Sequence, residues 1–228
     1  MFEGCTSLTG VPELPATELT KYCYQNMFKD CTSLTTAPII LAEILDTGCC
    51  AYMFDGCTSL TSAPELPATI LADNCYQNMF RKCTSLIGVS ELPATELWQD
   101  CYYGMFEGCT SLTTAPELPA TTLSSTCYYA IFSGCTSLTD APELPATELR
   151  GYCYANMFAD CTSLTGTPKL PATGLANYCY ANMFKDCTSL TAVVPELPAT
   201  ELKDYCYANM FKDCTSLTNA PALPATDV

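Results

Sequence analysis

Apolar side chains recur along this chain with a period of 26 residues. One stretch of each period reads Cys-Tyr-x-x-Met-Phe-x-x-Cys, as from Cys153 to Cys161, and places apolar residues at i, i+1, i+4, i+5 and i+8. At about 100° per residue these positions cover one side of a helix. The pattern therefore predicts an amphipathic helix of about two turns in every period.

Short signals flank this predicted helix. Candidate N-caps directly ahead of it are Asn74, Asp100 and Thr126. Glycines that end it, just before the next cysteine, are Gly56, Gly108 and Gly134. The following Thr-Ser-Leu-Thr-x-Ala is short and rich in β-forming residues, which predicts a strand. Pro38, Pro64 and their equivalents end that strand because proline has no backbone donor, and Pro-Glu-Leu-Pro predicts an extended connector.

Two columns of cysteine mark the repeat. The first comprises Cys5, Cys31, Cys57, Cys83, Cys109, Cys135, Cys161, Cys187 and, after one residue inserted at Val193-Val194, Cys214. The second comprises Cys23, Cys49, Cys75, Cys101, Cys127, Cys153, Cys179 and Cys206, and Cys50 lies outside both. Counted from the first-column cysteine as position 1, the unit reads C-T-S-L-T-x-A-P-E-L-P-A-T-x-L-x-x-x-C-Y-x-x-M-F-x-x.

Eight whole units result, at 5–30, 31–56, 57–82, 83–108, 109–134, 135–160, 161–186 and 187–213. Partial units stand at both ends of 1–228, which we interpret as one domain and as an excerpt of a longer chain. A single unit buries too little apolar surface to offset the entropy lost on ordering it, so units must stack on one another. We therefore predict a repeat solenoid with one short parallel strand and one helix of about two turns per unit. Its predicted core columns include Cys31, Leu34, Cys49, Met53, Phe54, Cys57, Leu60, Cys75, Met79 and Phe80.

The segment Met27-Phe28-Lys29-Asp30-Cys31-Thr32-Ser33-Leu34, repeated along the chain, resembles the BspA-type leucine-rich repeat of bacterial surface proteins. It is most similar to the 26-residue surface-protein repeat of bacterial lipoproteins. The resemblance implies a curved, right-handed leucine-rich-repeat coil in an extracellular or cell-surface setting. It also implies adhesion or partner binding, without catalysis and without a cofactor.

Composition and charge exclude several functions. The 228 residues contain no histidine, so Ser-His-Asp and Cys-His pairs and the usual mixed zinc sites are excluded. Nine basic side chains against 24 acidic ones give a net charge of −15, which argues against nucleic acid as a partner. No run of 18 apolar residues occurs, so we expect no membrane span in this segment, and no signal peptide is recognisable.

The 18 cysteines have three interpretations. Their apolar positions favour buried free thiols. Neighbours within one column can approach closely enough for disulfides between adjacent coils, whereas the two cysteines of one unit, eight residues apart on a helix, are about 12 Å apart and too distant. Metal binding is the third, and the least favoured, since a line of sulfurs does not surround a tetrahedral ion.

Acidic residues also form columns. One comprises Glu13, Glu65, Glu91, Glu117, Glu143 and Glu196, and the other Glu18, Glu96, Glu148, Glu201 and Asp227. Stacked like charges must face solvent or hold cations, so a solvated edge is favoured and a column of bound calcium ions is the alternative.

Threonines also form two files, beginning at Thr6 and Thr9. They lack the Thr-x-Thr spacing of an ice-binding surface, so we interpret them as residues that favour a strand.

Side chains that differ between units are the candidates for recognition. They concentrate at positions 14, 16 to 18, 21, 22 and 25 of the unit. The aromatic ones among them, Trp98, Tyr103, Tyr129 and Tyr52, are candidate ligand-binding residues. A second file comprises Tyr152, Tyr178 and Tyr205, although tyrosines that merely cover neighbouring coils are an equally open interpretation. In the second unit, residues 39–44 replace the usual motif with Ile-Ile-Leu-Ala-Glu-Ile, either as an apolar contact patch or as drift.

The favoured function is a non-enzymatic module that binds a protein or glycan ligand on a bacterial or phage-related surface. The alternative is a structural spacer or filament subunit, whose partners are further copies of itself. An enzyme is the third hypothesis. No acid-base pair or phosphate-binding glycine loop stands apart from the repeat, so we name no catalytic residue and no metal site.

Overall fold

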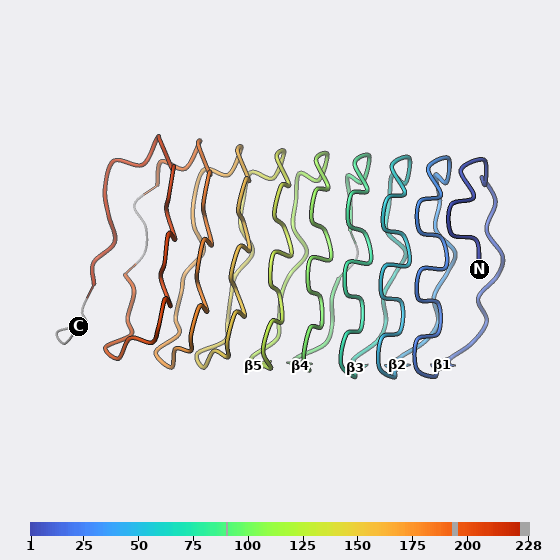
Figure 1. The fold of residues 1–228 in the computed structure, drawn as a ribbon, viewed down its shortest axis with the longest axis horizontal. Helices are drawn as coiled ribbons and strands as arrows, with labels where there is room; N and C mark the ends of the chain where they lie inside the picture. Colours follow the sequence, from blue (N-terminus) through green and yellow to red (C-terminus); the bar gives the residue numbers. More distant parts are fainter. Residues whose placement is uncertain (90, 193–195, 224–228) are drawn as a thin grey trace.

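The structure, a computed structural model, describes residues 1–89, 91–192 and 196–223. The chain winds into coils that lie side by side along one axis, with the N-terminal coil at one end and the last described coil at the other (Figure 1). Neighbouring coils are joined by parallel pairing between residues 26 apart, as between Glu18 and Ile44. Equivalent side chains of successive units therefore lie next to one another. The insertion at Val193-Val194 and the acidic residue Asp227 lie outside the described residues.

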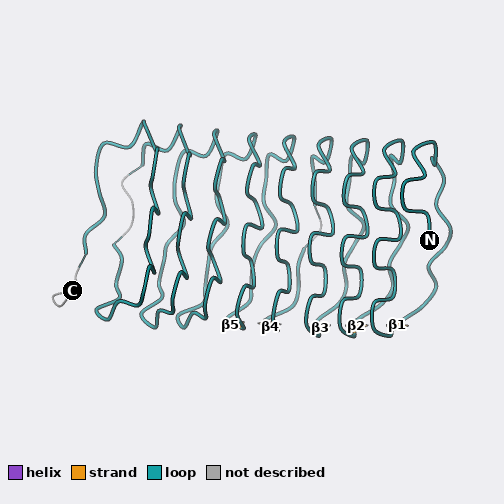
Figure 2. Ribbon diagram, viewed as in Figure 1, coloured by secondary structure: helices purple, strands orange, loops and turns teal. Residues whose placement is uncertain are grey.

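Five strands of two residues each occupy one edge of the stack (Figures 1 and 2). They are β1 (Glu18–Leu19), β2 (Ile44–Leu45), β3 (Ile70–Leu71), β4 (Glu96–Leu97) and β5 (Thr122–Leu123). β1, β2 and β3 form one parallel sheet, and β4 and β5 form another. In each strand the first side chain is exposed and the leucine is buried, because successive residues of a strand point to opposite faces.

These strands do not lie where the sequence predicted them. Within residues 1–89, 91–192 and 196–223, the predicted segment Thr-Ser-Leu-Thr-x-Ala contributes only isolated parallel bridges, Ser62 with Gly88 and Thr114 with Asp140. Its leucine is nevertheless fully buried in most coils, as at Leu60 and Leu86. The short parallel strands form instead where an exposed residue precedes a buried leucine, at positions 14 and 15 of the unit.

The predicted helix is wrong: none of the described residues forms a helix, whether of one turn or of membrane-spanning length. The Cys-Tyr-x-x-Met-Phe-x-x-Cys stretch is instead a series of overlapping turns. The Met27 N–H donates to the Tyr24 carbonyl (3.1 Å), and the next N–H, that of Phe28, donates to Met53 in the following coil (2.9 Å). Backbone bonds thus alternate between a local turn and the neighbouring coil.

The turns place left-handed residues at every second or every fourth position of this stretch. Tyr152, Asn156 and Asp160 have φ values of 61°, 56° and 62°. A positive φ at only the third residue of a turn is typical of type II turns. The expected N-caps Asn74, Asp100 and Thr126 are also left-handed, with φ of 62°, 57° and 60°, and so serve as turn residues rather than caps. The expected terminating glycines Gly56, Gly108 and Gly134 share this conformation.

A helix of about two turns loses to this arrangement for a physical reason. Such a helix leaves its first four N–H groups and last four carbonyls without an internal partner, which is most of its backbone. In the turn series those groups are satisfied by the adjacent coil. Stacked coils therefore favour turns over an isolated short helix.

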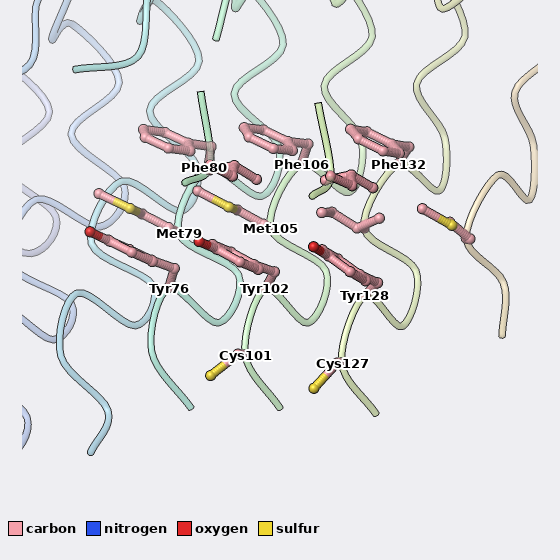
Figure 3. Packing of buried hydrophobic residues seen from close by; sticks show 14 of the residues in the cluster. Tyr76, Met79, Phe80, Cys101, Tyr102, Met105, Phe106, Cys127, Tyr128 and Phe132 are labelled. Carbon is pink, nitrogen blue, oxygen red and sulfur yellow. The ribbon is translucent and has the colours of Figure 1, made fainter. Parts of the chain in front are cut away.

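The core consists of parallel columns of identical side chains. Figure 3 shows Phe80, Phe106 and Phe132 in one row and Tyr76, Tyr102 and Tyr128 in another, with Met79 and Met105 between them. Ring centroids are 5.7 Å apart between Phe80 and Phe106 and 5.8 Å apart between Tyr76 and Tyr102. The ten residues expected in the core columns are all fully buried, namely Cys31, Leu34, Cys49, Met53, Phe54, Cys57, Leu60, Cys75, Met79 and Phe80.

Truncating one ring of the phenylalanine column is expected to destabilise the fold strongly. Phe106 is 1 % exposed and stacks on rings in both adjacent coils. We expect Phe106→Ala to lower the free energy of unfolding by about 3–5 kcal/mol, measured by urea denaturation. The matched control Ile87→Ala, at a side chain 60 % exposed, should change it by less than about 0.5 kcal/mol. Equal effects of the two substitutions would contradict the column as a core element.

Candidate functional site

The cysteine columns have a structural role. Each first-column thiol from Cys31 onward donates to a phenylalanine carbonyl of the preceding coil, as Cys109 does to Phe80 (3.1 Å). In the second column, Cys127 donates to the Trp98 carbonyl at 3.0 Å. All eighteen cysteines lie within the described residues and are free thiols. Only Cys5 is exposed and only Cys23 is half-buried.

Burial also makes these thiols poor nucleophiles. It raises the pKa of Cys57 and Cys101 to about 12 and that of Cys49 to about 11. The thiolate, which is the reactive and metal-binding form, is therefore suppressed at neutral pH. Among the residues that the structure describes, no three acidic or cysteine side chains gather closely enough to hold a metal ion.

The acidic columns lie at the surface. Every described member is exposed, from Glu13 to Glu196 in one column and from Glu18 to Glu201 in the other. Ile44 and Ile70, which pair with each other between β2 and β3, interrupt the second column between Glu18 of β1 and Glu96 of β4. The carboxylates consequently give this edge a negative charge around an apolar interval.

Three of the four candidate aromatic residues lie in one patch, which we call the tyrosine patch (Tyr52, Arg81, Tyr103, Glu107 and Tyr129). The Tyr103 and Tyr129 rings stack at 4.7 Å. The Arg81 guanidinium lies 6.0 Å from the centre of the Tyr52 ring. Desolvation raises the pKa of Tyr103, and the proximity of Tyr129, Glu107 and Tyr52 adds to the rise.

An ion pair between a half-buried arginine and a buried carboxylate anchors the tyrosine patch. Arg81 donates from Nε and Nη2 to the two carboxylate oxygens of Asp55, at 3.0 and 2.9 Å. The Asp55 side chain is only 3 % exposed, and the hydrogen bonds raise the pKa of Arg81. Both residues occupy position 25 of adjacent units, so stacking alone brings them together.

Trp98 stands apart from this patch. It directly follows β4, is 59 % exposed, and lines a shallow hollow that we call the Trp98 hollow (Asp73, Trp98, Gln99, Ser124, Ser125 and Arg150). On its other side Trp98 borders a groove over β1, β2 and β3 that exposes Ile44 and Ile70. The structure thus divides the four candidates into two sites.

The polar members of both sites were not predicted from the sequence. Arg81, Asp55, Arg150, Asp73 and Gln99 all stand at positions 16, 17 and 25 of the unit, where units differ. Aligning the units and comparing residues 26 apart would have found the Asp55 and Arg81 pair.

The second tyrosine file is a real stack. Tyr152, Tyr178 and Tyr205 have ring centroids 4.7 and 4.8 Å apart. Its outer members, Tyr152 and Tyr205, are 41 % and 63 % exposed.

The unusual segment 39–44 has exposed and buried apolar side chains. Ile39, Leu41 and Ile44 are exposed, while Ile40 and Ala42 are buried. The replacement of the usual motif therefore does create exposed apolar surface.

The sequence matches the family described as "BspA type Leucine rich repeat region" in six copies, over residues 1–94, 47–165 and 99–218. This match confirms the resemblance predicted from the repeat. A solved structure of a leucine-rich repeat protein from Bacteroides ovatus ATCC 8483 is similar, with 17 % identity and a TM-score of 0.36 over 94 % of this chain and 67 % of that chain. The search of curated proteins yields no match.

Alkaline pH should destabilise the fold through its buried thiols. A thiol of ordinary pKa 9.0 ionises in the unfolded chain, whereas Cys57 stays neutral in the fold up to about pH 12. Above pH 9 the folded state then binds more protons, so its stability falls by about 1.4 kcal/mol per pH unit for each such thiol. In urea denaturation from pH 7 to 11, Cys57→Ala should lessen this slope by about that amount, and the non-ionising control Ile87→Ala, at an exposed site, should not. A slope of zero above pH 9 would contradict the neutral buried thiols.

Removing Arg81 should leave a buried carboxylate without its partner. We expect Arg81→Ala to lower the free energy of unfolding by about 3 kcal/mol, because breaking a buried ion pair strands the remaining charge. The double variant Arg81→Ala with Asp55→Ala should recover most of that loss in the same denaturation measurement. If the single and double variants are equally unstable, the pair is not coupled in this way.

Proposed function

Because the chain belongs to the BspA-type leucine-rich repeat family, we propose that it is a non-enzymatic binding module at a bacterial or phage-related cell surface. Repeats of this family are typical of bacterial surface proteins, and the family is generally non-enzymatic and suited to protein interaction. The role proposed for the whole chain of stacked units is adhesion to a protein or glycan ligand.

One observation carries this proposal. Several of the side chains that differ between units are exposed or half-buried on a backbone that is otherwise uniform, and they gather in the tyrosine patch and the Trp98 hollow. Partly exposed aromatic rings flanked by an arginine are typical of binding surfaces, in which a few such residues supply most of the affinity. Fixed coils also lose little entropy when a ligand binds, since their backbone is already ordered.

A spacer or filament subunit is the second candidate. The uninterrupted phenylalanine column from Phe2 to Phe211 favours it, because identical stacked coils provide length and stiffness. Electron microscopy across a concentration series would then show rods that lengthen with concentration. Monomers alone at high concentration would count against this alternative.

Binding should depend on both surfaces and not on folding. We expect Trp98→Ala combined with Tyr103→Ala to reduce retention on immobilised mucin, which presents both polypeptide and glycan, by at least about tenfold. Circular dichroism should show an unchanged fold, since Trp98 is largely exposed. The control Ile87→Ala, exposed but outside both surfaces, should bind as the native chain does. Full retention of the double variant, or no retention of the native chain, would contradict the proposal.

A further inference from the structure

We propose that the Trp98 hollow is a subsite for a neutral glycan, bound through one hexopyranose ring. This inference rests on the proposed binding function and names the ligand class for one of its two surfaces.

The shape of the hollow follows from one column of the repeat. Position 16 carries Trp98, Ser124 and Arg150 in three successive units. A small side chain therefore lies between two large ones, which stand about two strand spacings, or about 10 Å, apart. This leaves a recess floored by Ser124 and walled by an aromatic ring and a guanidinium group.

The backbone beneath the hollow is held from both sides. The Trp98 carbonyl accepts hydrogen bonds from the Cys127 thiol (3.0 Å) and from the Cys101 N–H (3.2 Å). The Ser124 N–H donates to the Leu97 carbonyl at 2.9 Å, and the Ser124 carbonyl accepts from the Cys153 thiol at 3.3 Å. The recess is thus formed before a ligand arrives, which lowers the entropic cost of binding.

The lining groups match the chemistry of a sugar ring. A pyranose presents a face of C–H bonds, which stacks on an aromatic platform such as Trp98, and a rim of hydroxyls. Asp73 offers carboxylate oxygens, of which Oδ1 already accepts from the Gln99 N–H at 3.1 Å and is thereby fixed in place. Gln99, Ser124 and Ser125 add donors and acceptors of both kinds. An apolar platform with a few fixed polar groups is typical of small-ligand sites.

Charge favours a neutral sugar over an acidic one. The chain has a net charge of −15 and only two arginines. Arg81 is paired with Asp55, whereas Arg150 makes no ion pair within the described part of the chain and is free to donate to hydroxyls. Asp73 within the hollow and Asp46 and Glu18 along the adjoining groove repel a carboxylated or sulfated glycan.

The test uses the fact that Trp98 is the only tryptophan of the chain, so that its fluorescence reports this site alone. The probes are the neutral hexasaccharides cellohexaose, laminarihexaose, mannohexaose and β-1,4-galactohexaose, with hexagalacturonic acid as the anionic comparator. We expect at least one neutral probe to shift the emission saturably, with a Kd between about 10 μM and about 1 mM. Arg150→Ala and Asp73→Ala should each weaken that binding at least about fivefold. Tyr205→Ala, an exposed aromatic of another unit, is the control and should leave it unchanged.

Three results would overturn the subsite: no shift by any neutral probe up to about 20 mM, equal binding of the anionic comparator, or unchanged affinity in both the Arg150→Ala and Asp73→Ala variants. Its failure is distinguishable from failure of the proposed function. If mucin retention depends on Trp98 and Tyr103 but no saccharide shifts the emission, the adhesion role stands and only the glycan inference falls. If a saccharide binds but mucin retention is unaffected by the double variant, the subsite stands and the adhesion role falls.

Discussion

The structure depends on the backbone hydrogen bonds that join each coil to the next. In the turn series alternate N–H groups donate to a carbonyl of an adjacent coil, most of them forwards, as from Asp30 to Asp55 (2.7 Å), and some backwards, as from Tyr76 to Cys49 (3.2 Å). A coil without a neighbour would leave these groups unsatisfied, at a cost that its own few apolar contacts do not offset. Stacking is consequently a condition for each unit to fold at all. It also fixes the register, which brings equivalent side chains together whatever their chemistry.

That register suits some side chains and constrains others. Aromatic rings stack, and thiols find a carbonyl in the preceding coil, so phenylalanine and cysteine can repeat indefinitely. Like charges cannot be buried in columns, and the described acidic columns are accordingly exposed. The buried Asp55 is compatible with the fold because the next unit places Arg81 at the same position. A change of one residue in such a column therefore alters the environment of its two neighbours.

The sequence predicted which residues share a column and which columns are buried, because both follow from the period alone. It failed on the local backbone. Apolar spacing of i, i+1, i+4, i+5 and i+8 fits one face of a helix, but it fits a series of turns equally well, and the turns win because their free groups bond to a neighbour. The frequent Asn, Asp and Gly in this stretch, such as Asn156 and Asp160, were the available signal for left-handed residues. Tyr152, equally left-handed, gave none.

Because the local backbone was not predicted, the arrangement of the candidate sites was not predicted either. The four aromatic candidates were found because they depart from the repeat, namely Trp98, Tyr52, Tyr103 and Tyr129. Their separation into two surfaces depends on where the chain turns between positions 16 and 21 of the unit. The sequence pattern did not determine that turn. The Trp98 hollow shows why such departures matter. Its backbone is held by thiol-to-carbonyl bonds that several other coils repeat, so replacing Ser124 by a larger residue would fill the recess without disturbing the coil beneath. A repeat whose stability lies in its backbone and core columns leaves the outward-facing positions free to vary from one coil to the next.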